Sequence, residues 1–231
     1  MNRLILGVVF GLVMCLSASS THAQHKHGDH APGKDAKEMA LPNCPVMDEP
    51  INLALSIPTN EGPVYFCCEG CIPKFQKDPA KYAAKVAAQR KALAHRAKVQ
   101  VTCPVTNEPV DKKIFVESKG QKIYMCRKAC VGKYQSDPSK YAAALANSYT
   151  FQTKCPVMGG DIDPKVFSKL STGETIYYCC PGCDNPLREN PAKYNKSLVS
   201  QGIVINWAKV KKATSEDGHD HGSPDHGDHD H

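Results

Sequence analysis

The sequence predicts an α+β protein of three tandem small ββα modules, with helical spacers between them and disordered His-rich tails at both ends. The 231-residue chain has 12 cysteines, most of which recur in one repeated motif. Within each repeat, β-branched and aromatic residues form two short runs separated by turn residues, as in a β-hairpin. Helix-capping residues follow the last cysteine of each repeat at a constant distance. With 41% hydrophobic and 23% charged residues, wholesale disorder is not expected.

Residues 1–23 have the three-part layout of a secretory signal peptide. A basic residue near the start precedes an apolar run from Leu4 to Leu16, and small residues then lead to a cleavage site after Ala23. The run is too short to span a bilayer comfortably, and it is the only long one, so we predict no membrane span after cleavage. We expect a periplasmic or secreted protein that enters an oxidising compartment with eleven cysteines, an odd number.

Three copies of one motif fill the body of the chain and define modules 1, 2 and 3 at residues 41–99, 100–150 and 151–200. Each copy opens with Cys-Pro-Val, continues with Tyr-x-Cys-x-x-x-Cys and closes with Asp/Asn-Pro-x-x-Tyr. Copies one and two are 59 residues apart at every landmark, and copies two and three are 52 or 53 apart. The last cysteine precedes the Asp/Asn-Pro pair by 7 residues each time. Constant spacing of this kind identifies an internal repeat.

Each copy has the same expected local structure. Cys-Pro-Val is a turn, and residues such as 114–116 and 122–125 form a hairpin around 119–121. The two cysteines four residues apart then mark a helix start with both thiols on one face. In copy one, the Ala-, Lys- and Arg-rich stretch 80–99 predicts a long basic helix that acts as a spacer. The expected N-caps, each followed by Pro, are Asp78, Asp137 and Asn190.

Thiol chemistry is expected to hold each module together. A unit shorter than roughly 70–80 residues rarely has enough core and needs disulfides or a metal. Each copy has few large apolar residues besides the aromatic residues next to its cysteines. A long gap followed by a close pair of cysteines is similar to a zinc-site layout, and a helix N-terminus favours the thiolate. The candidate metal ligands are Cys44, Cys67, Cys71, Cys103, Cys126, Cys130, Cys155, Cys179 and Cys183.

The fourth ligand of each site is left open by the sequence. Met47 and Met158 lie three residues after the first cysteine in copies one and three, where copy two has Thr106. They are either thioether ligands, which favour a soft ion such as Cu(I), or fillers of the core. Cys68 and Cys180 are extra cysteines of the same two copies. They are candidates for metal ligands, disulfide partners or small buried hydrophobic residues.

Two other classes of protein compete with a metal-binding one. A disulfide-stapled envelope interaction protein with no metal role suits the oxidising compartment, although three cysteines in copy two cannot pair completely. A thiol oxidoreductase is disfavoured because the close pairs of the triads are Cys-x-x-x-Cys rather than Cys-x-x-Cys. The repeated motifs offer no histidine base, paired carboxylates or phosphate loop, and His95 on the basic stretch is expected to be a surface residue, so we do not expect an enzyme.

The combined motif resembles the YHS domain and its relative the TRASH domain, over about residues 42–87, 101–146 and 153–199. The resemblance implies a small treble-clef-like ββα unit that is associated with heavy-metal sensing, transport and trafficking. It also implies that the nine triad cysteines are the ligands. The chain departs from the family in having Cys-Pro-Val-Met where a Cys-Gly-Met order is more frequent.

Both ends of the chain have His-rich tails, one in residues 24–40 and one in residues 215–231 of the C-terminal segment 201–231. Tracts of this composition cannot pack a core and bind metal loosely, and imidazole with carboxylate suits Cu(II), Zn or Ni. The irregular spacing of their histidines differs from the uninterrupted run of a purification tag. The additional candidate ligands are His25, His27, His30, His219, His221, His226, His229 and His231.

Taken together, these patterns predict an exported protein that sequesters copper or zinc or hands it to another protein. Its expected partners are metal ions and a metal-transport protein or metalloprotein. The net charge of +6 combines a basic body with an acidic C-terminal tail. Such a body would suggest nucleic-acid binding in the cytosol, but export argues against it.

Overall fold

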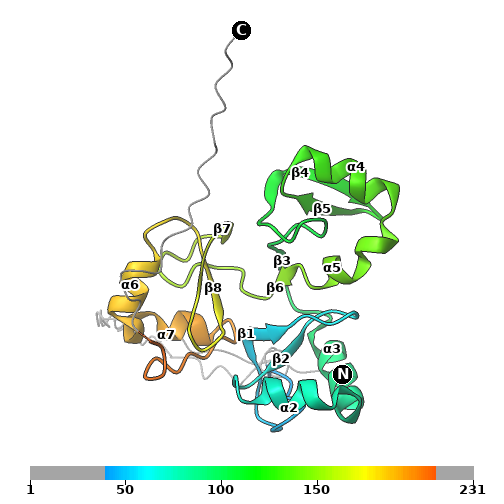
Figure 1. The fold of residues 1–231 in the computed structure, drawn as a ribbon. Coiled ribbons are helices and arrows are strands. Elements are labelled where there is room, and N and C mark those ends of the chain that lie inside the picture. Colours follow the sequence, from blue (N-terminus) through cyan, green and yellow to red (C-terminus); the bar gives the residue numbers. More distant parts are fainter. Residues whose placement is uncertain (1–39, 212–231) are drawn as a thin grey trace, which may run out of the picture. The chain divides into compact units, whose positions relative to one another are not determined.

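The computed structural model describes residues 40–211, so the predicted signal peptide and all eight candidate histidines lie outside the described residues. It confirms the α+β class. Each module contains an antiparallel two-stranded hairpin followed by short helices, labelled along the chain in Figure 1. No helix within residues 40–211 combines the length and apolar character needed to cross a membrane.

The elements of the three modules follow one order, in which the hairpin comes before the helices. Module 1 contains β1 (Asn52–Ile57), β2 (Val64–Phe66), α2 (Cys71–Lys77), the 3-10 helix η1 (Pro79–Tyr82) and α3 (Ala83–Leu93). Module 2 contains β4 (Asp111–Ser118), β5 (Gln121–Met125), α4 (Lys128–Ser136), the 3-10 helix η2 (Ser139–Tyr141) and α5 (Ala142–Ala146), with β3 (Val99–Gln100) pairing to β6 (Tyr149–Thr150) across its ends. Module 3 contains β7 (Asp163–Lys169), β8 (Thr175–Tyr178), α6 (Asp184–Glu189) and α7 (Pro191–Val199).

The hairpin and the caps predicted from the sequence are confirmed. Strands β4 and β5 pair from Ser118 and Gln121 inwards, and the two residues between them have positive φ, as a tight hairpin turn requires. The oxygen of each expected N-cap side chain accepts a hydrogen bond from the backbone N–H three residues later, at 3.3, 3.1 and 3.3 Å. These caps are Asp78, Asp137 and Asn190.

The prediction of a long basic spacer helix over 80–99 is wrong in both the extent and the role of the helix. A 3-10 turn occupies its start, α3 ends at Leu93, and Val99 is already in strand β3. Strand pairing with β6 overrides the local helix propensity there. The helix is no solvated spacer either, because Val86, Gln89 and Leu93 are buried against module 1.

Each module has an apolar core of its own, larger than the sequence suggested. In module 1, three apolar residues of β1 and its approach, Ile51, Leu53 and Leu55, are at most 3% exposed and pack around the aromatic residues of β2. The cores of modules 2 and 3 form around Met125 and Tyr178. The expectation that thiol chemistry alone holds the modules is therefore corrected. Apolar burial contributes as well, at roughly 25 cal/mol per Å².

A buried glutamine ties the cysteine-bearing strand of each module to another segment, and we call this contact the glutamine clamp. Its side-chain amide accepts a hydrogen bond from a tyrosine N–H and donates one to the carbonyl of the same tyrosine, at distances of 2.7–3.0 Å. That tyrosine lies two residues before the second cysteine of the triad. The pairs are Gln89 with Tyr65, Gln100 with Tyr124, and Gln152 with Tyr177.

The clamp is reached by two different routes. In modules 2 and 3 the glutamine lies three residues before Cys-Pro-Val, at Gln100 and Gln152. In module 1 that position is Leu41, and Gln89 reaches back from α3 instead. All three glutamines are at most 4% exposed. Because a buried amide must find partners, each clamp fixes the strand directly in front of the sulfur cluster.

Candidate metal centres

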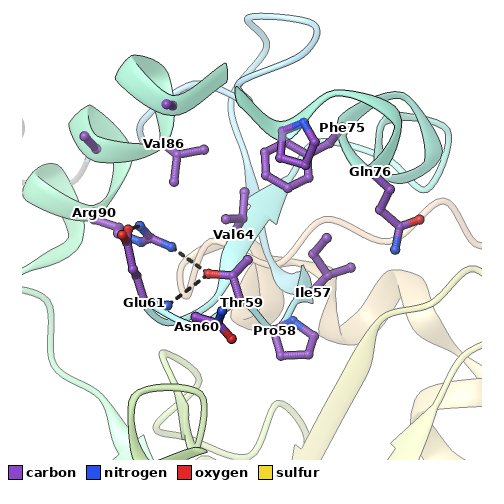
Figure 2. A pocket seen from close by; sticks show the side chains of 13 residues that line it. Ile57, Pro58, Thr59, Asn60, Glu61, Val64, Phe75, Gln76, Val86 and Arg90 are labelled. Carbon is purple, nitrogen blue, oxygen red and sulfur yellow. Dashed lines mark hydrogen bonds and ion pairs between the residues drawn. The ribbon is translucent and has the colours of Figure 1, made fainter. Parts of the chain in front are cut away.

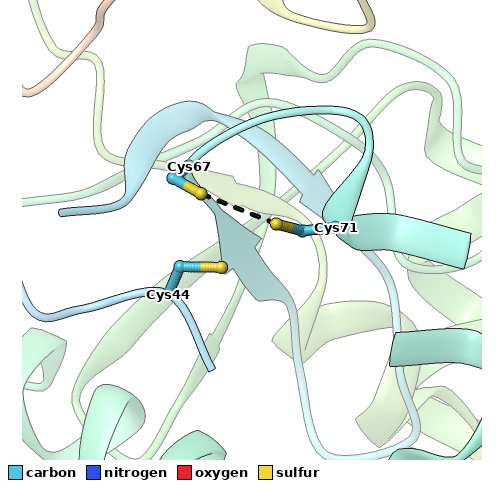
Figure 3. Close-up of side chains that lie close together, drawn as sticks. All are labelled: Cys44, Cys67 and Cys71. Atoms are coloured by element: carbon cyan, nitrogen blue, oxygen red, sulfur yellow. Dashed lines mark hydrogen bonds between the residues drawn. The ribbon is translucent and has the colours of Figure 1, made fainter. Parts of the chain in front are cut away.

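Three clusters of cysteine sulfur stand out in the described residues, one in each module. In module 1, Cys44 comes from the Cys-Pro-Val turn, Cys67 follows β2 and Cys71 begins α2, and Figure 3 shows their sulfurs facing one another. The three Sγ atoms of each cluster all lie within 4.8 Å of one another. The first and third cysteines are buried and the second is half-buried. The clusters are Cys44–Cys67–Cys71, Cys103–Cys126–Cys130 and Cys155–Cys179–Cys183.

A tight turn presents the first cysteine of each cluster. The Cys44 N–H donates to the Glu49 carbonyl at 2.7 Å, and the Asp48 N–H donates back to the Cys44 carbonyl at 3.0 Å. The turn needs one residue with positive φ, and the three modules supply Asp48 (63°), Asn107 (61°) and Gly159 (72°). These residue types tolerate the left-handed region best, so the sequence encodes the turn in all three copies.

Backbone N–H groups favour the thiolate form of the first cysteine. Burial alone would raise the pKa of Cys44, but N–H groups of Met47, Cys67 and Val46 donate to its sulfur and lower the pKa below its ordinary value. The pKa of Cys103 and of Cys155 is lowered by equivalent N–H groups, also against the effect of burial. Hydrogen bonds to the charged form stabilise it. One sulfur in each cluster is thus ready to coordinate a cation.

Four other thiols of the clusters have a raised pKa, which favours their protonated form when no cation is bound. Burial raises the pKa of Cys67 and of Cys130 to about 11, and burial with neighbouring thiols also raises the pKa of Cys71 and Cys183. Three negative charges within 4.8 Å would repel one another strongly. A bound metal cation reverses this balance, because it displaces the remaining protons.

The sulfur separations fit a metal ion of the size of zinc. Tetrahedral coordination with Zn–S bonds of about 2.3 Å places neighbouring sulfurs roughly 3.8 Å apart. The close pairs of the clusters are 3.6, 3.6 and 4.0 Å apart in modules 1, 2 and 3. All eleven cysteines of residues 40–211 are free thiols in the structure. The donor set, which consists of sulfur in every cluster, suits zinc or Cu(I).

The two methionines do not fill the core. Met47 is 52% exposed and Met158 is 70% exposed, so their interpretation as core filler is wrong. Their backbone N–H groups are the atoms that contact the cluster, through Cys44 and Cys155. In module 2 the equivalent Thr106 also contacts its cluster by its side chain, with Oγ1 3.1 Å from the Cys126 Sγ.

The two extra cysteines lie at the rims of the clusters. Cys68 and Cys180 are exposed, so they are not small buried hydrophobic residues. Cys68 Sγ is 3.7 Å from Cys71 Sγ, and Cys180 Sγ is 3.4 Å from Cys183 Sγ. Each pair has the Cys-x-x-Cys spacing, which the triads do not have. Spacing is therefore no ground against a thiol oxidoreductase in modules 1 and 3.

Sequence reasoning missed one sulfur near a cluster. Met125 Sδ lies 3.8 Å from Cys103 Sγ, and the Met125 side chain is fully buried. The equivalent residues, Phe66 and Tyr178, are buried core aromatics that cannot coordinate a metal through sulfur. In the sequence, the one signal at this position is the alignment of Met125 with Phe66 and Tyr178. That alignment indicates a core residue rather than a metal ligand.

A hollow of about 500 Å³ in module 1 is separate from the sulfur cluster. Figure 2 shows its lining, which includes Ile57, Val64 and Phe75 but no cysteine. At its edge, Arg90 pairs with Glu61 and donates to Thr59 Oγ1 at 2.8 Å, while the buried Arg90 Nε has no hydrogen-bond partner.

Comparison of the chain with models of protein families, with curated proteins and with solved structures finds no match.

Proposed function

We propose that this chain is an exported transition-metal-binding protein that sequesters copper or zinc or hands it to another protein. The observation that carries the proposal is the convergence of three sulfurs in each of three modules. In each cluster, backbone N–H groups lower the pKa of the first cysteine and so favour its thiolate form. One soft cation would bind to the three cysteines of each cluster. Its charge would balance the charge of the thiolates, and it would displace the protons of the thiols that are still protonated.

The rest of the sequence supports this role. The combined motif resembles YHS and TRASH domains, which are associated with heavy-metal handling. The signal-like residues 1–23 suit a periplasmic or secreted protein, and the histidines of both tails would collect divalent ions near the modules. The clusters consist of cysteines alone within residues 40–211, which favours binding and transfer over catalysis. The recipient would be a metal-transport protein or a metalloprotein.

The proposal is tested on mature protein purified without a chelating column, by elemental analysis together with a thiol count in denaturant. We expect at least one sulfur-bound ion per module, and thiols that react only after the metal is removed. Absorption from charge transfer between thiolate and metal identifies ions on cysteine and separates them from ions on the histidine tails. A protein with no bound metal, no uptake of added zinc or Cu(I), and at most one free thiol would refute it.

The second candidate is the disulfide-stapled interaction protein with no metal role. The 3.4 Å separation between the sulfurs of Cys180 and Cys183 favours it, since a small movement would allow a bond. An oxidising compartment favours it as well. The same thiol count separates the two candidates, because this one leaves a single unpaired thiol among the eleven cysteines outside residues 1–23.

A further inference from the structure

The three clusters differ at one position of the rim, immediately after the second cysteine of the triad. Module 1 has Cys68 there and module 3 has Cys180, whereas module 2 has Arg127. The side chains of all three are exposed, next to a cluster whose first and third cysteines are buried. The residue at this position therefore determines which side-chain group lies next to a bound ion on the exposed side of the cluster.

In modules 1 and 3 this position adds a fourth sulfur at a coordinating separation. Cys68 Sγ lies 4.0 Å from Cys67 Sγ and 3.7 Å from Cys71 Sγ, and Cys180 Sγ lies 3.8 Å and 3.4 Å from its counterparts. These distances bracket the roughly 3.8 Å edge of a tetrahedral zinc–sulfur site. The sulfur lies outside the 4.8 Å group formed with the first cysteine, and its exposure leaves it free to turn inwards.

Module 2 presents charged and hydroxyl groups in place of that sulfur. The Arg127 guanidinium pairs with the Glu108 carboxylate, which accepts a hydrogen bond from Thr106 Oγ1 at 3.2 Å. Thr106 Oγ1 in turn lies 3.1 Å from Cys126 Sγ. These exposed side chains supply no fourth sulfur to the cluster. The other nearby sulfur, Met125, occupies a core position that is aromatic in both other modules.

We propose that the three metal sites are of two kinds, with closed four-thiolate sites in modules 1 and 3 and a three-thiolate site in module 2 that is open for ligand exchange. Cys68 and Cys180 are the fourth ligands of the closed sites. Four thiolates saturate a tetrahedral ion and retain it, while three leave a position for a donor atom of an acceptor. The inference rests on the proposed function, because it assumes that the triads bind metal.

The test uses the whole mature chain, loaded with cadmium under reducing conditions. Cadmium NMR distinguishes sites with four sulfurs from sites with three. Loss of the thiolate-to-cadmium absorption after addition of a chelator measures release from cysteine alone. We expect two four-sulfur signals and one three-sulfur signal, with one ion released at least about tenfold faster than the other two. Loss of a ligand is expected to exceed the tenfold to hundredfold effect typical of outer contacts.

Substitutions assign the signals to modules. Cys68→Ser with Cys180→Ser is expected to convert both slow ions to fast release and both signals to the three-sulfur type. Arg127→Cys is expected to convert the fast ion to slow release. Arg127→Ser is the matched control, because it removes the charge without adding sulfur and keeps the three-sulfur signal. Met125→Leu is expected to change neither signal nor rate.

Several results would overturn the two kinds of site while leaving metal binding intact. They are equal release of all three ions, no effect of the double serine variant, a Cys68–Cys71 disulfide in the loaded protein, or a change of the module 2 signal in Met125→Leu. Failure of the wild-type chain to take up cadmium on cysteine would instead refute the proposed function itself.

Discussion

Replacement of Gln152 by Ala should destabilise module 3 strongly, because it removes a glutamine clamp. Gln152 is 1% exposed. Its amide makes hydrogen bonds of 2.9 Å with the Tyr177 N–H, 2.7 Å with the Tyr177 carbonyl and 3.1 Å with the Lys154 carbonyl. Each such bond contributes about 1 kcal/mol net, so we expect the free energy of unfolding to fall by about 3 kcal/mol.

Urea titration followed by tryptophan fluorescence measures this effect in module 3 specifically. Trp207 is the only tryptophan of the chain, and it packs half-buried against the module 3 core. With a urea slope of about 1.5 kcal/mol per M, the transition midpoint should shift by about 2 M. Metal loading and reductant are held constant between variants, because bound metal stabilises the folded state by mass action.

Two further variants separate the hydrogen bonds from packing. Gln152→Met keeps most of the side-chain volume but removes the amide, and we expect it to reproduce most of the loss. Asn195→Ala removes an exposed amide of α7 in the same module and should leave the midpoint in place. A shift for Gln152→Ala of less than about 0.5 M, at unchanged slope, would show that the clamp does not hold the strand as inferred.

Three other expected outcomes concern the pH dependence of zinc affinity, the close packing at Gly202 and the helix cap at Asn190. Because burial raises the pKa of Cys71, zinc must displace protons, so its affinity should rise with pH, by up to about one log unit per pH unit for each proton displaced, and fall on acidification. Competition with a chelating dye measures this, and a flat profile contradicts it. Gly202→Ala should lower the thermal midpoint by several degrees, since its φ is 77° and a Cβ would lie 2.7 Å from Leu53 Cδ1. Gly120→Ala, with φ 75° and open space, should cost less. Asn190→Ala should lower the stability of module 3 by about 1 kcal/mol by tryptophan fluorescence, while Asn190→Asp should not.

The sequence predicted the features that depend on spacing along one repeat. Turn residues, a hairpin and a helix start follow one another locally, so the repeat itself brings Cys103, Cys126 and Cys130 together. The caps follow from the same kind of local signal. The left-handed residue of the turn was also present in the sequence, as Asp48 or Asn107, although it was not recognised.

Features that depend on contacts between distant segments were not predictable in this way. Gln89 reaches Tyr65 from a helix 24 residues later, and the equivalent residues of the other repeats, Ser148 and Gln201, do not bond to the corresponding tyrosine. The end of α3 is decided by strand pairing outside the helix rather than by its own propensity. The exposure of the Met47 side chain depends on the orientation of the Cys-Pro-Val turn relative to the cluster. The amino-acid composition does not predict that orientation.

The position of the glutamine clamps sets where this protein can be dissected. The ranges 42–87, 101–146 and 153–199, which the repeated motif delimits, each stop short of the clamp residue by one or two positions; the residues left out are Gln89, Gln100 and Gln152. Pieces excised at these limits would keep every cysteine of the clusters but would lose the glutamine side-chain amide that fixes the strand in front of each cluster. Truncations meant to isolate a working unit should therefore carry α3 at the C-terminal side of the first piece, and an N-terminal extension through the glutamine in the other two.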